Sequence, residues 1–101
     1  MPNLNHTQLE VGEFYRFIQL ATGEFEFSLA SPFSMSHYQM AEGRAVKGAG
    51  YIGFNENRLR MDMDCYGSIS LGVKCDDECV KELENLLGKK VVTSKHLSWK
   101  H

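Results

Sequence analysis

The sequence predicts an α+β domain: a curved antiparallel β-meander of about five or six strands, one helix at about residues 76–88 and a final strand. Apolar and polar side chains alternate most clearly in 58–75, and turn sequences divide 13–30 and 44–75 into short segments, which is typical of strands in hairpins. Residues 76–88 instead space their apolar side chains three and four apart, as in an amphipathic helix. A chain of 101 residues has room for one core, so we expect a single domain, 1–101.

Residues 13–30 are predicted to form a hairpin, because Thr22-Gly23 suits a two-residue hairpin loop. This loop places Arg16 opposite Leu29 on the apolar face of the hairpin. A charged group on an apolar face needs a partner or solvent. Arg16 is therefore expected either at the rim of the sheet or in a cavity, where its guanidinium would bind a carboxylate or a phosphate.

The other face of this hairpin is polar except for two aromatic side chains, Tyr15 and Phe17. Exposed aromatic residues that lie together mark surfaces of interaction. We therefore expect the chain to associate with itself through this face, and a homodimer is the predicted oligomeric state.

Two segments show no regular alternation of side chains. Residues 1–10 are polar and are predicted to be a loosely held lead-in. Residues 31–42 contain Pro32 and many small and polar residues, and are predicted to be a connection whose later half is extended.

A three-strand meander is predicted over residues 44–75. The odd-numbered side chains of its middle strand are apolar and its even-numbered ones are charged. A slip of one residue would turn the apolar set towards water, so the alternation determines the register. It pairs Phe54 with Leu59 across a two-residue loop, and Met61 with Val73 across a three-residue loop.

The segment 76–88 carries signals for both ends of a helix. Asp76 suits the N-cap and is followed by acidic residues in the first turn, where the helix dipole favours negative charge. Gly88 suits the position after the last turn. The predicted core-facing stripe consists of Cys79, Val80, Leu83, Leu86 and Leu87.

The string Gly48-Ala49-Gly50-Tyr51-Ile52-Gly53 matches the G-x-G-x-x-G pattern of dinucleotide sites, in which a strand turns into a helix. Here a turn, Asn55-Glu56-Asn57, follows almost at once and leads into another strand. We interpret the glycines as points where a strand bends sharply, which extends the fold prediction to a small or partial barrel. No cofactor is predicted.

The chain has three cysteines, Cys65, Cys75 and Cys79. Their odd number and the lack of a secretion signal indicate reduced thiols, so no disulfide is predicted. All three fall on predicted apolar faces and their spacing is a weak zinc motif, so no metal site is predicted. Cys79 starts a helix beside acidic residues that disfavour a thiolate, and is expected to be inert.

Composition and charge exclude several classes of protein. Hydrophobic residues make up 43% and charged residues 24%, as in globular domains. No apolar run is long enough for a transmembrane helix and no signal peptide is recognisable, so we expect a soluble, cytoplasmic protein without membrane contact. Nucleic-acid binding is not predicted, because the lysines near the C-terminus lie next to an acidic helix that they neutralise.

The predicted function is a non-catalytic binding module that holds a small, partly apolar ligand or a protein partner in or on the curved sheet. Methionines line adaptable apolar pockets, and the outer face of the meander sets a few polar side chains among small ones. The candidate ligand-binding residues are Arg16, Tyr51, Met61, Asp62 and Met63.

Two alternatives stay open. The first is a small enzyme whose site at the mouth of the sheet needs at least two titratable groups within hydrogen-bond reach. Its residues would be Arg16, His37, Tyr38, Tyr51 and Asp62. The second is an inhibitor or immunity-type protein that acts by protein–protein contact, for which we expect an acidic or aromatic patch and no pocket.

Overall fold

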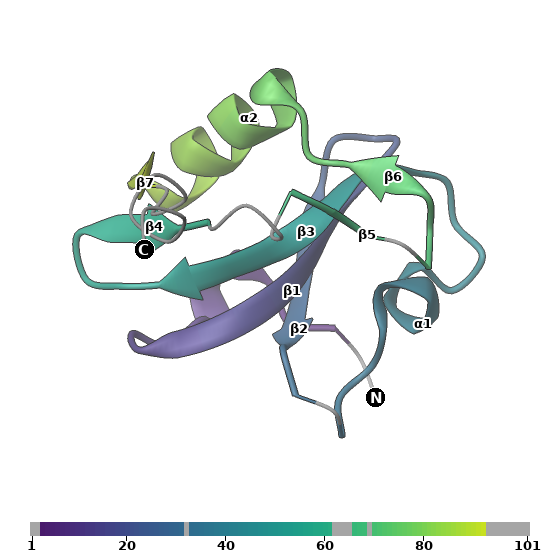
Figure 1. Cartoon of the computed structure of the whole chain (residues 1–101), viewed down its shortest axis with the longest axis horizontal. Helices are drawn as coiled ribbons and strands as arrows, with labels where there is room; N and C mark the ends of the chain where they lie inside the picture. Colours follow the sequence, from purple (N-terminus) through teal and green to yellow (C-terminus); the bar gives the residue numbers. More distant parts are fainter. Residues whose placement is uncertain (1–2, 32, 62–65, 69, 93–101) are drawn as a thin grey trace, which may run out of the picture.

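The computed structural model describes residues 3–31, 33–61, 66–68 and 70–92 and shows an α+β fold around one five-stranded sheet (Figure 1). The strand order is β2-β1-β3-β4-β7, and all neighbours are antiparallel except β4 and β7, which are parallel. The bounds are β1 Glu13–Leu20, β2 Phe25–Leu29, β3 Val46–Phe54, β4 Arg58–Arg60 and β7 Lys90–Val92. The α+β prediction is confirmed. The barrel variant is wrong, because the sheet ends in two edge strands, β2 and β7.

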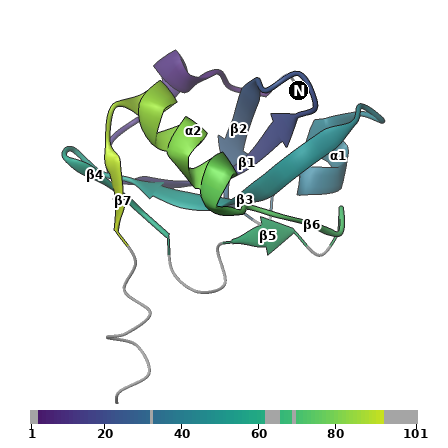
Figure 2. The same ribbon diagram turned by 90° about the horizontal axis from the view of Figure 1, so that it is seen from above.

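The remaining elements cover the sheet on both sides. These are a short 3-10 helix η1 (His6–Gln8), α1 (His37–Ala41), the strand pair β5 (Gly67–Ser68) and β6 (Val73–Lys74), and α2 (Asp77–Leu87). Seen from above, α2 and η1 lie on one side of the sheet, and β5 and β6 lie on the other (Figure 2). Met40 and Ala41 of α1 pack on this second side, with Ile18 and Ala49.

The hairpin of β1 and β2 has a register that differs by one residue from the prediction. Tyr15 pairs with Leu29 and Phe17 pairs with Phe27, so Arg16 lies opposite Ser28 and not Leu29. The cause is a loop of three residues, 21–23, which Gly23 closes at φ 101° while the Leu20 amide donates to the Glu24 carbonyl at 2.8 Å. A left-handed backbone of this kind is adopted readily by glycine.

The corrected register places Tyr15 and Phe17 inside the protein, where they are 2% and 0% exposed. The surface argument for self-association through these aromatic residues was therefore wrong. They belong to the apolar core beneath α2, with Phe27, Ile52 and Leu83. A second, smaller core lies on the opposite side of the sheet and contains Ile18, Leu20, Met40, Ala41 and Ala49.

The glycine-rich string lies within strand β3, which confirms that it does not turn into a helix. Its first glycine allows a close approach of α2 to the sheet. A Cβ added at Gly48 would lie 2.9 Å from the Cys79 sulfur, closer than real contacts allow. Gly48 therefore makes room for the helix, and the register of β1 against β3 also shifts beside it, between Gln19 and Leu20.

The predicted meander is correct in its first half only. Phe54 pairs with Leu59 across the Glu56-Asn57 loop, as expected. The pairing of Met61 with Val73 is wrong, because the Met61 amide donates to the Val92 carbonyl at 3.0 Å and β7 takes the place beside β4. Val73 pairs instead with Ser68, in the separate sheet of β5 and β6. The alternation of this half also pairs Met63 with Leu71 and Cys65 with Ile69. Met63, Cys65 and Ile69 lie outside the described residues, so these two pairings stay predictions.

Helix α2 is confirmed, with the Asp76 side chain accepting a hydrogen bond from the Cys79 amide at 2.9 Å and Gly88 ending the helix at φ 66°. The extended half predicted for 31–42 is wrong, because Ser36 forms a capping box with Gln39 that starts α1. Within the described ranges, no helix is long and apolar enough to cross a membrane.

The lead-in is held more firmly than expected. The Leu4 amide and carbonyl form hydrogen bonds of 2.7 and 2.9 Å with Phe27, which extends the edge of β2. Asn5 then caps η1, and its capping box with Gln8 fixes this turn next to the sheet.

Candidate functional site

The structure gives Arg16 a role that neither sequence interpretation anticipated. Its Nη1 donates to three backbone carbonyls, those of Leu29 at 3.2 Å, Ser31 at 3.1 Å and Met35 at 3.2 Å. The guanidinium carbon also lies 5.9 Å from the centre of the Tyr51 ring. Arg16 therefore ties the segment after β2 to the sheet, and its charge is met by carbonyl dipoles and an aromatic ring.

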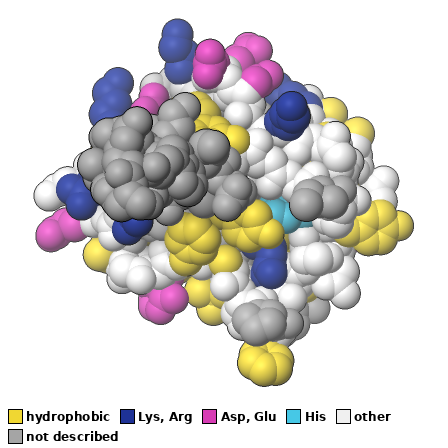
Figure 3. All heavy atoms as spheres, viewed as in Figure 1, with side chains coloured by type: hydrophobic (Ala, Val, Ile, Leu, Met, Phe, Trp, Pro, Cys, Tyr) yellow, Lys and Arg dark blue, Asp and Glu magenta, His cyan; other side chains and the backbone are white. Residues whose placement is uncertain are grey.

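Tyr51 is the centre of a ring cluster on the β5–β6 side of the sheet. It stacks on Phe14 at 6.2 Å between ring centres and meets His37 edge-on at 4.9 Å. His37 Nε2 lies 2.8 Å from the Gly50 carbonyl oxygen, and burial lowers the pKa of His37 from its usual value. Figure 3 shows hydrophobic side chains beside a histidine and a basic side chain near the middle of this side of the molecule.

Two of the five predicted ligand-binding residues, Arg16 and Tyr51, are in contact in this cluster. Met61 is 0% exposed and belongs to the core on the α2 side, so it does not share a surface with them. Asp62 and Met63 lie outside the described residues. Of the residues named for an enzyme, the structure gathers Arg16, His37 and Tyr51, whereas Tyr38 is 68% exposed.

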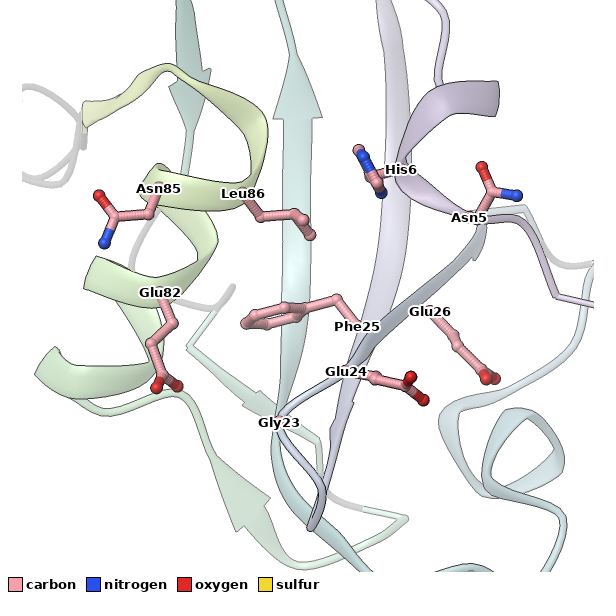
Figure 4. Close-up of a pocket in the computed structure, with 9 residues that line it drawn as sticks. All are labelled: Asn5, His6, Gly23, Glu24, Phe25, Glu26, Glu82, Asn85 and Leu86. Carbon is pink, nitrogen blue, oxygen red and sulfur yellow. The ribbon is translucent and has the colours of Figure 1, made fainter.

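A groove of about 740 Å³ lies on the opposite side of the sheet, between α2, the turn of the β1–β2 hairpin and η1 (Figure 4). Figure 4 shows Phe25 reaching from β2 and Leu86 reaching from α2 into the same space. These two side chains form an apolar floor. The lining consists of Asn5, His6, Gly23, Glu24, Phe25, Glu26, Glu82, Asn85 and Leu86.

A buried glutamine joins the two main walls of this groove. Gln19 is 1% exposed, and its Nε2 donates to the Glu82 carboxylate of α2 at 2.6 Å and to the Gly23 carbonyl of the hairpin turn at 3.3 Å. The Lys47 ammonium is more distant from Glu82, at 4.0 Å. Gln19 therefore sets the spacing between helix and hairpin, and it turns the Glu82 carboxylate towards the turn.

The three glutamates of the groove differ in their partners. Glu26 accepts two hydrogen bonds from Arg44, at 2.9 and 2.7 Å, and one from Asn3 at 2.7 Å. The hydrogen bond to Arg44 lowers the pKa of Glu26. Glu24 is exposed and makes no ion pair with any described residue, so Glu24 and Glu82 are the carboxylates that a ligand in the groove can meet.

Sequence reasoning missed this groove. It did place Leu86 on the apolar stripe of the helix and recognised the turn at Gly23. The groove nevertheless depends on which strand α2 lies against, and on a three-residue loop that the predicted register did not contain. The strongest available signal was Leu86 itself, an apolar residue at the edge of the stripe that stays 36% exposed.

Cys75, just before α2, and Cys79, on the apolar side of α2, both lie in the core as predicted, at 5% and 3% exposure. Both are free thiols, and their sulfur atoms are 3.2 Å apart. In the part of the chain that the structure describes, no group of three or more His, Cys, Asp or Glu side chains is arranged to hold a metal ion. Cys65 lies outside that part.

Comparisons of the chain with known protein families, with curated proteins and with solved structures find no match.

Proposed function

We propose that this protein is a non-catalytic binding module, and that the groove between α2 and the β1–β2 hairpin holds a small organic cation with an apolar body. One observation carries the proposal: an apolar floor and two carboxylates, Glu24 without an ion pair in the described chain and Glu82 with a long one to Lys47 at 4.0 Å, share a groove of about 740 Å³. The nine described residues that line this groove include no lysine or arginine. This volume is within the usual range for small-molecule sites, roughly 300 to 1,000 Å³.

The floor of the groove supplies the apolar part of the proposed interaction. Phe25 is half-buried and is backed by Phe17 at 5.9 Å and Phe27 at 6.4 Å between ring centres, so its ring is held in place before a ligand binds. Leu86 is 36% exposed and loses water contact when the groove is filled. Covering such surface contributes about 25 cal/mol per Å².

The rim supplies the charge selectivity. Glu24 is exposed without an ion-pair partner in the described chain, and the Glu82 carboxylate is fixed by Gln19 at 2.6 Å. Glu26 is already neutralised by Arg44 and serves the fold rather than a ligand. An ammonium group placed over the floor would meet carboxylates, whereas an anion would be repelled by them.

The groove also favours this function over the two alternatives. An inhibitor or immunity-type protein was expected to have no pocket. The gathered residues of the enzyme hypothesis, Arg16 and His37, are within hydrogen-bond distance of backbone carbonyls, and these contacts hold the segment 29–37 against the sheet. The homodimer and the cytoplasmic location stay predictions.

The test is a set of NMR titrations of ¹⁵N-labelled protein with three molecules that differ mainly in charge. The first is 2-phenylethylammonium, the second is the neutral 2-phenylethanol, and the third is the anionic 3-phenylpropionate. We expect saturable amide shifts in 23–26 and 82–86, with the cation binding most tightly and the anion least. Replacement of Leu86 by serine should weaken binding of the cation about fivefold, since roughly 1 kcal/mol of apolar contact is lost.

Two matched controls keep this test specific. Leu29→Ser removes a leucine of similar exposure, 42%, that does not line the groove, and should leave binding unchanged. Glu24→Gln should weaken binding of the cation by about two- to fivefold, whereas Glu56→Gln, in the loop between β3 and β4, should not. Shifts that map to the Arg16 side of the sheet, or an anion that binds as tightly as the cation, would show that the proposal is wrong.

A further inference from the structure

We propose that Cys75 and Cys79 form a dithiol modification site that exchanges with a low-molecular-weight disulfide to give an intramolecular Cys75–Cys79 disulfide. The two sulfur atoms lie 3.2 Å apart, with the Cys75 thiol donating to the Cys79 sulfur. A disulfide bond is about 2.05 Å long, so the sulfurs need to approach each other by only a little more than 1 Å. This site does not involve the lining of the groove and stands independently of the proposed ligand.

Both cysteines project from backbone that the fold holds in place. The Cys75 amide donates to the Tyr66 carbonyl at 3.1 Å, between the end of β6 and the start of α2. The Cys79 amide donates to the side chain of the N-cap residue, Asp76, at 2.9 Å. Gly48 of β3 leaves the space that the Cys79 sulfur occupies. The fold therefore holds the two residues at backbone positions from which their sulfur atoms meet.

The hydrogen bond between the thiols assigns them an order of reaction. Cys75 donates its proton to Cys79, and this bond together with burial raises the pKa of Cys75. Cys79 is thus the sulfur that attacks first, in contrast to the inert thiol that the sequence predicts at this position. Its thiolate displaces one thiolate from the small disulfide and forms a mixed disulfide. Cys75 then loses its proton and attacks the Cys79 sulfur, which releases the second thiolate. Two cysteine thiols and one small disulfide give one protein disulfide and two small thiols.

Burial determines when this reaction occurs. Neither thiol is more than 5% exposed, so the small disulfide reaches Cys79 only when the start of α2 opens. The first step, attack on the small disulfide, is therefore slow in the folded protein. The second step joins two sulfur atoms of the same chain, and the folded arrangement of Cys75 beside Cys79 favours it. Preorganisation of this kind accelerates ring closure.

The test is to equilibrate the full chain with 2-hydroxyethyl disulfide and 2-mercaptoethanol, alkylate it with iodoacetamide and digest it with trypsin. Cleavage after Lys74 and Lys81 places Cys75 and Cys79 in one peptide, 75–81, and Cys65 in another, 61–74. We expect peptide 75–81 to lose two hydrogen atoms and both sites of alkylation, and to regain them after reduction. The same equilibration in concentrated urea should give a fraction of this disulfide about tenfold smaller, since the unfolded chain lacks the close approach.

Three results would overturn the proposal. They are a peptide 75–81 that stays fully alkylated, a disulfide from either cysteine to Cys65, and a yield in the folded protein no higher than in urea. The order of attack has a separate check. Cys75→Ser should accumulate the mixed disulfide at Cys79, whereas Cys79→Ser should leave Cys75 largely unmodified. The mapping of the unmutated chain decides the proposal even where a serine variant does not fold.

Discussion

The two sides of the central sheet are covered in different ways. On one side α2, eleven residues long, packs Leu83 and Cys79 against the aromatic side chains of β1 and β2. On the other side α1, five residues long, contributes Met40 and Ala41 to a core that otherwise contains Ile18, Leu20 and Ala49. The first side is held by large apolar side chains, and the second has smaller ones.

On the second side, hydrogen bonds and other polar contacts add to the packing of the smaller apolar core. Arg16 donates to three carbonyls of the segment that leads into α1, and His37, the first residue of α1, is 2.8 Å from the carbonyl oxygen of Gly50. Contacts of this kind depend on geometry and on protonation, whereas apolar packing does not. The comparison predicts that the α2 side dominates the global stability and that the α1 side is the more sensitive to pH.

The largest expected effect on stability comes from truncating the fully buried apolar side chain of each helix. Leu83 of α2 and Met40 of α1 are both 0% exposed. Leu83→Ala should lower the free energy of unfolding by about 4 kcal/mol, and Met40→Ala by about 2 kcal/mol, because a short helix can relax into the space that methionine leaves. Urea unfolding followed by far-ultraviolet circular dichroism measures both values.

Native-state hydrogen exchange separates global from local effects in this pair. Leu83→Ala should raise exchange throughout the sheet, and Met40→Ala mainly in 37–41 and nearby residues. If Met40→Ala lowers the free energy of unfolding as much as Leu83→Ala does, the two sides of the sheet contribute equally to stability. The proposed difference between them is then wrong.

A smaller effect is expected from the close approach of α2 to β3. An alanine Cβ at position 48 would lie 2.9 Å from the Cys79 sulfur, so α2 or the sulfur must move. Gly48→Ala should lower the free energy of unfolding by about 1 to 3 kcal/mol. Adding Cys79→Ala removes the crowding atom, so the double variant should be more stable than the sum of the two single effects predicts.

Gly53 supplies a control in the same strand. A Cβ there would lie 3.3 Å from an atom of Phe14, whose ring is 41% exposed and can shift over the Tyr51 ring on which it stacks. Gly53→Ala should therefore change stability by less than about 0.5 kcal/mol, since a small loss of contact is offset by reduced freedom of the unfolded chain. Equal costs at the two positions would contradict the packing role of Gly48.

Signals that are local in sequence predicted their elements correctly. Asp76 and Gly88 bound α2, and Glu56-Asn57 forms the two-residue loop that pairs Phe54 with Leu59. In each case the residues that specify the turn or cap lie within a few positions of the element they end. The strand interpretation of the glycine-rich string was correct for the same reason, since a turn follows it directly.

Elements that depend on distant partners were predicted wrongly. The register of β1 and β2 followed from a two-residue loop at Thr22-Gly23, and the side-chain pattern could not correct it. The sheet is covered on both sides, so Phe17 and Ile18 are each 0% exposed. Alternation carries little information about register when both faces are buried. The parallel pairing of β4 with β7 and the groove beside Leu86 likewise depend on elements that are far apart in the sequence.

The smallest of these effects is a dependence of stability on pH through His37. Burial lowers the pKa of His37 in the folded protein, so the unfolded chain binds the proton more readily. The stabilising contribution of neutral His37 is therefore present above its ordinary pKa of 6.5 and is lost as the pH falls below it. His37→Gln, which cannot titrate, should reduce the fall in stability below pH 6.5.

The matched control for this prediction is His6→Gln, on the α2 side, because His6 is exposed in η1. Thermal unfolding between pH 8 and pH 5 compares the three proteins, and hydrogen exchange at the two ends of this range locates the change. Loss of protection at low pH should begin in 37–41 while the α2 side stays closed. If His6→Gln flattens the pH profile as much as His37→Gln does, or if α2 opens first, the polar contacts of the α1 side are not what makes the fold sensitive to acid.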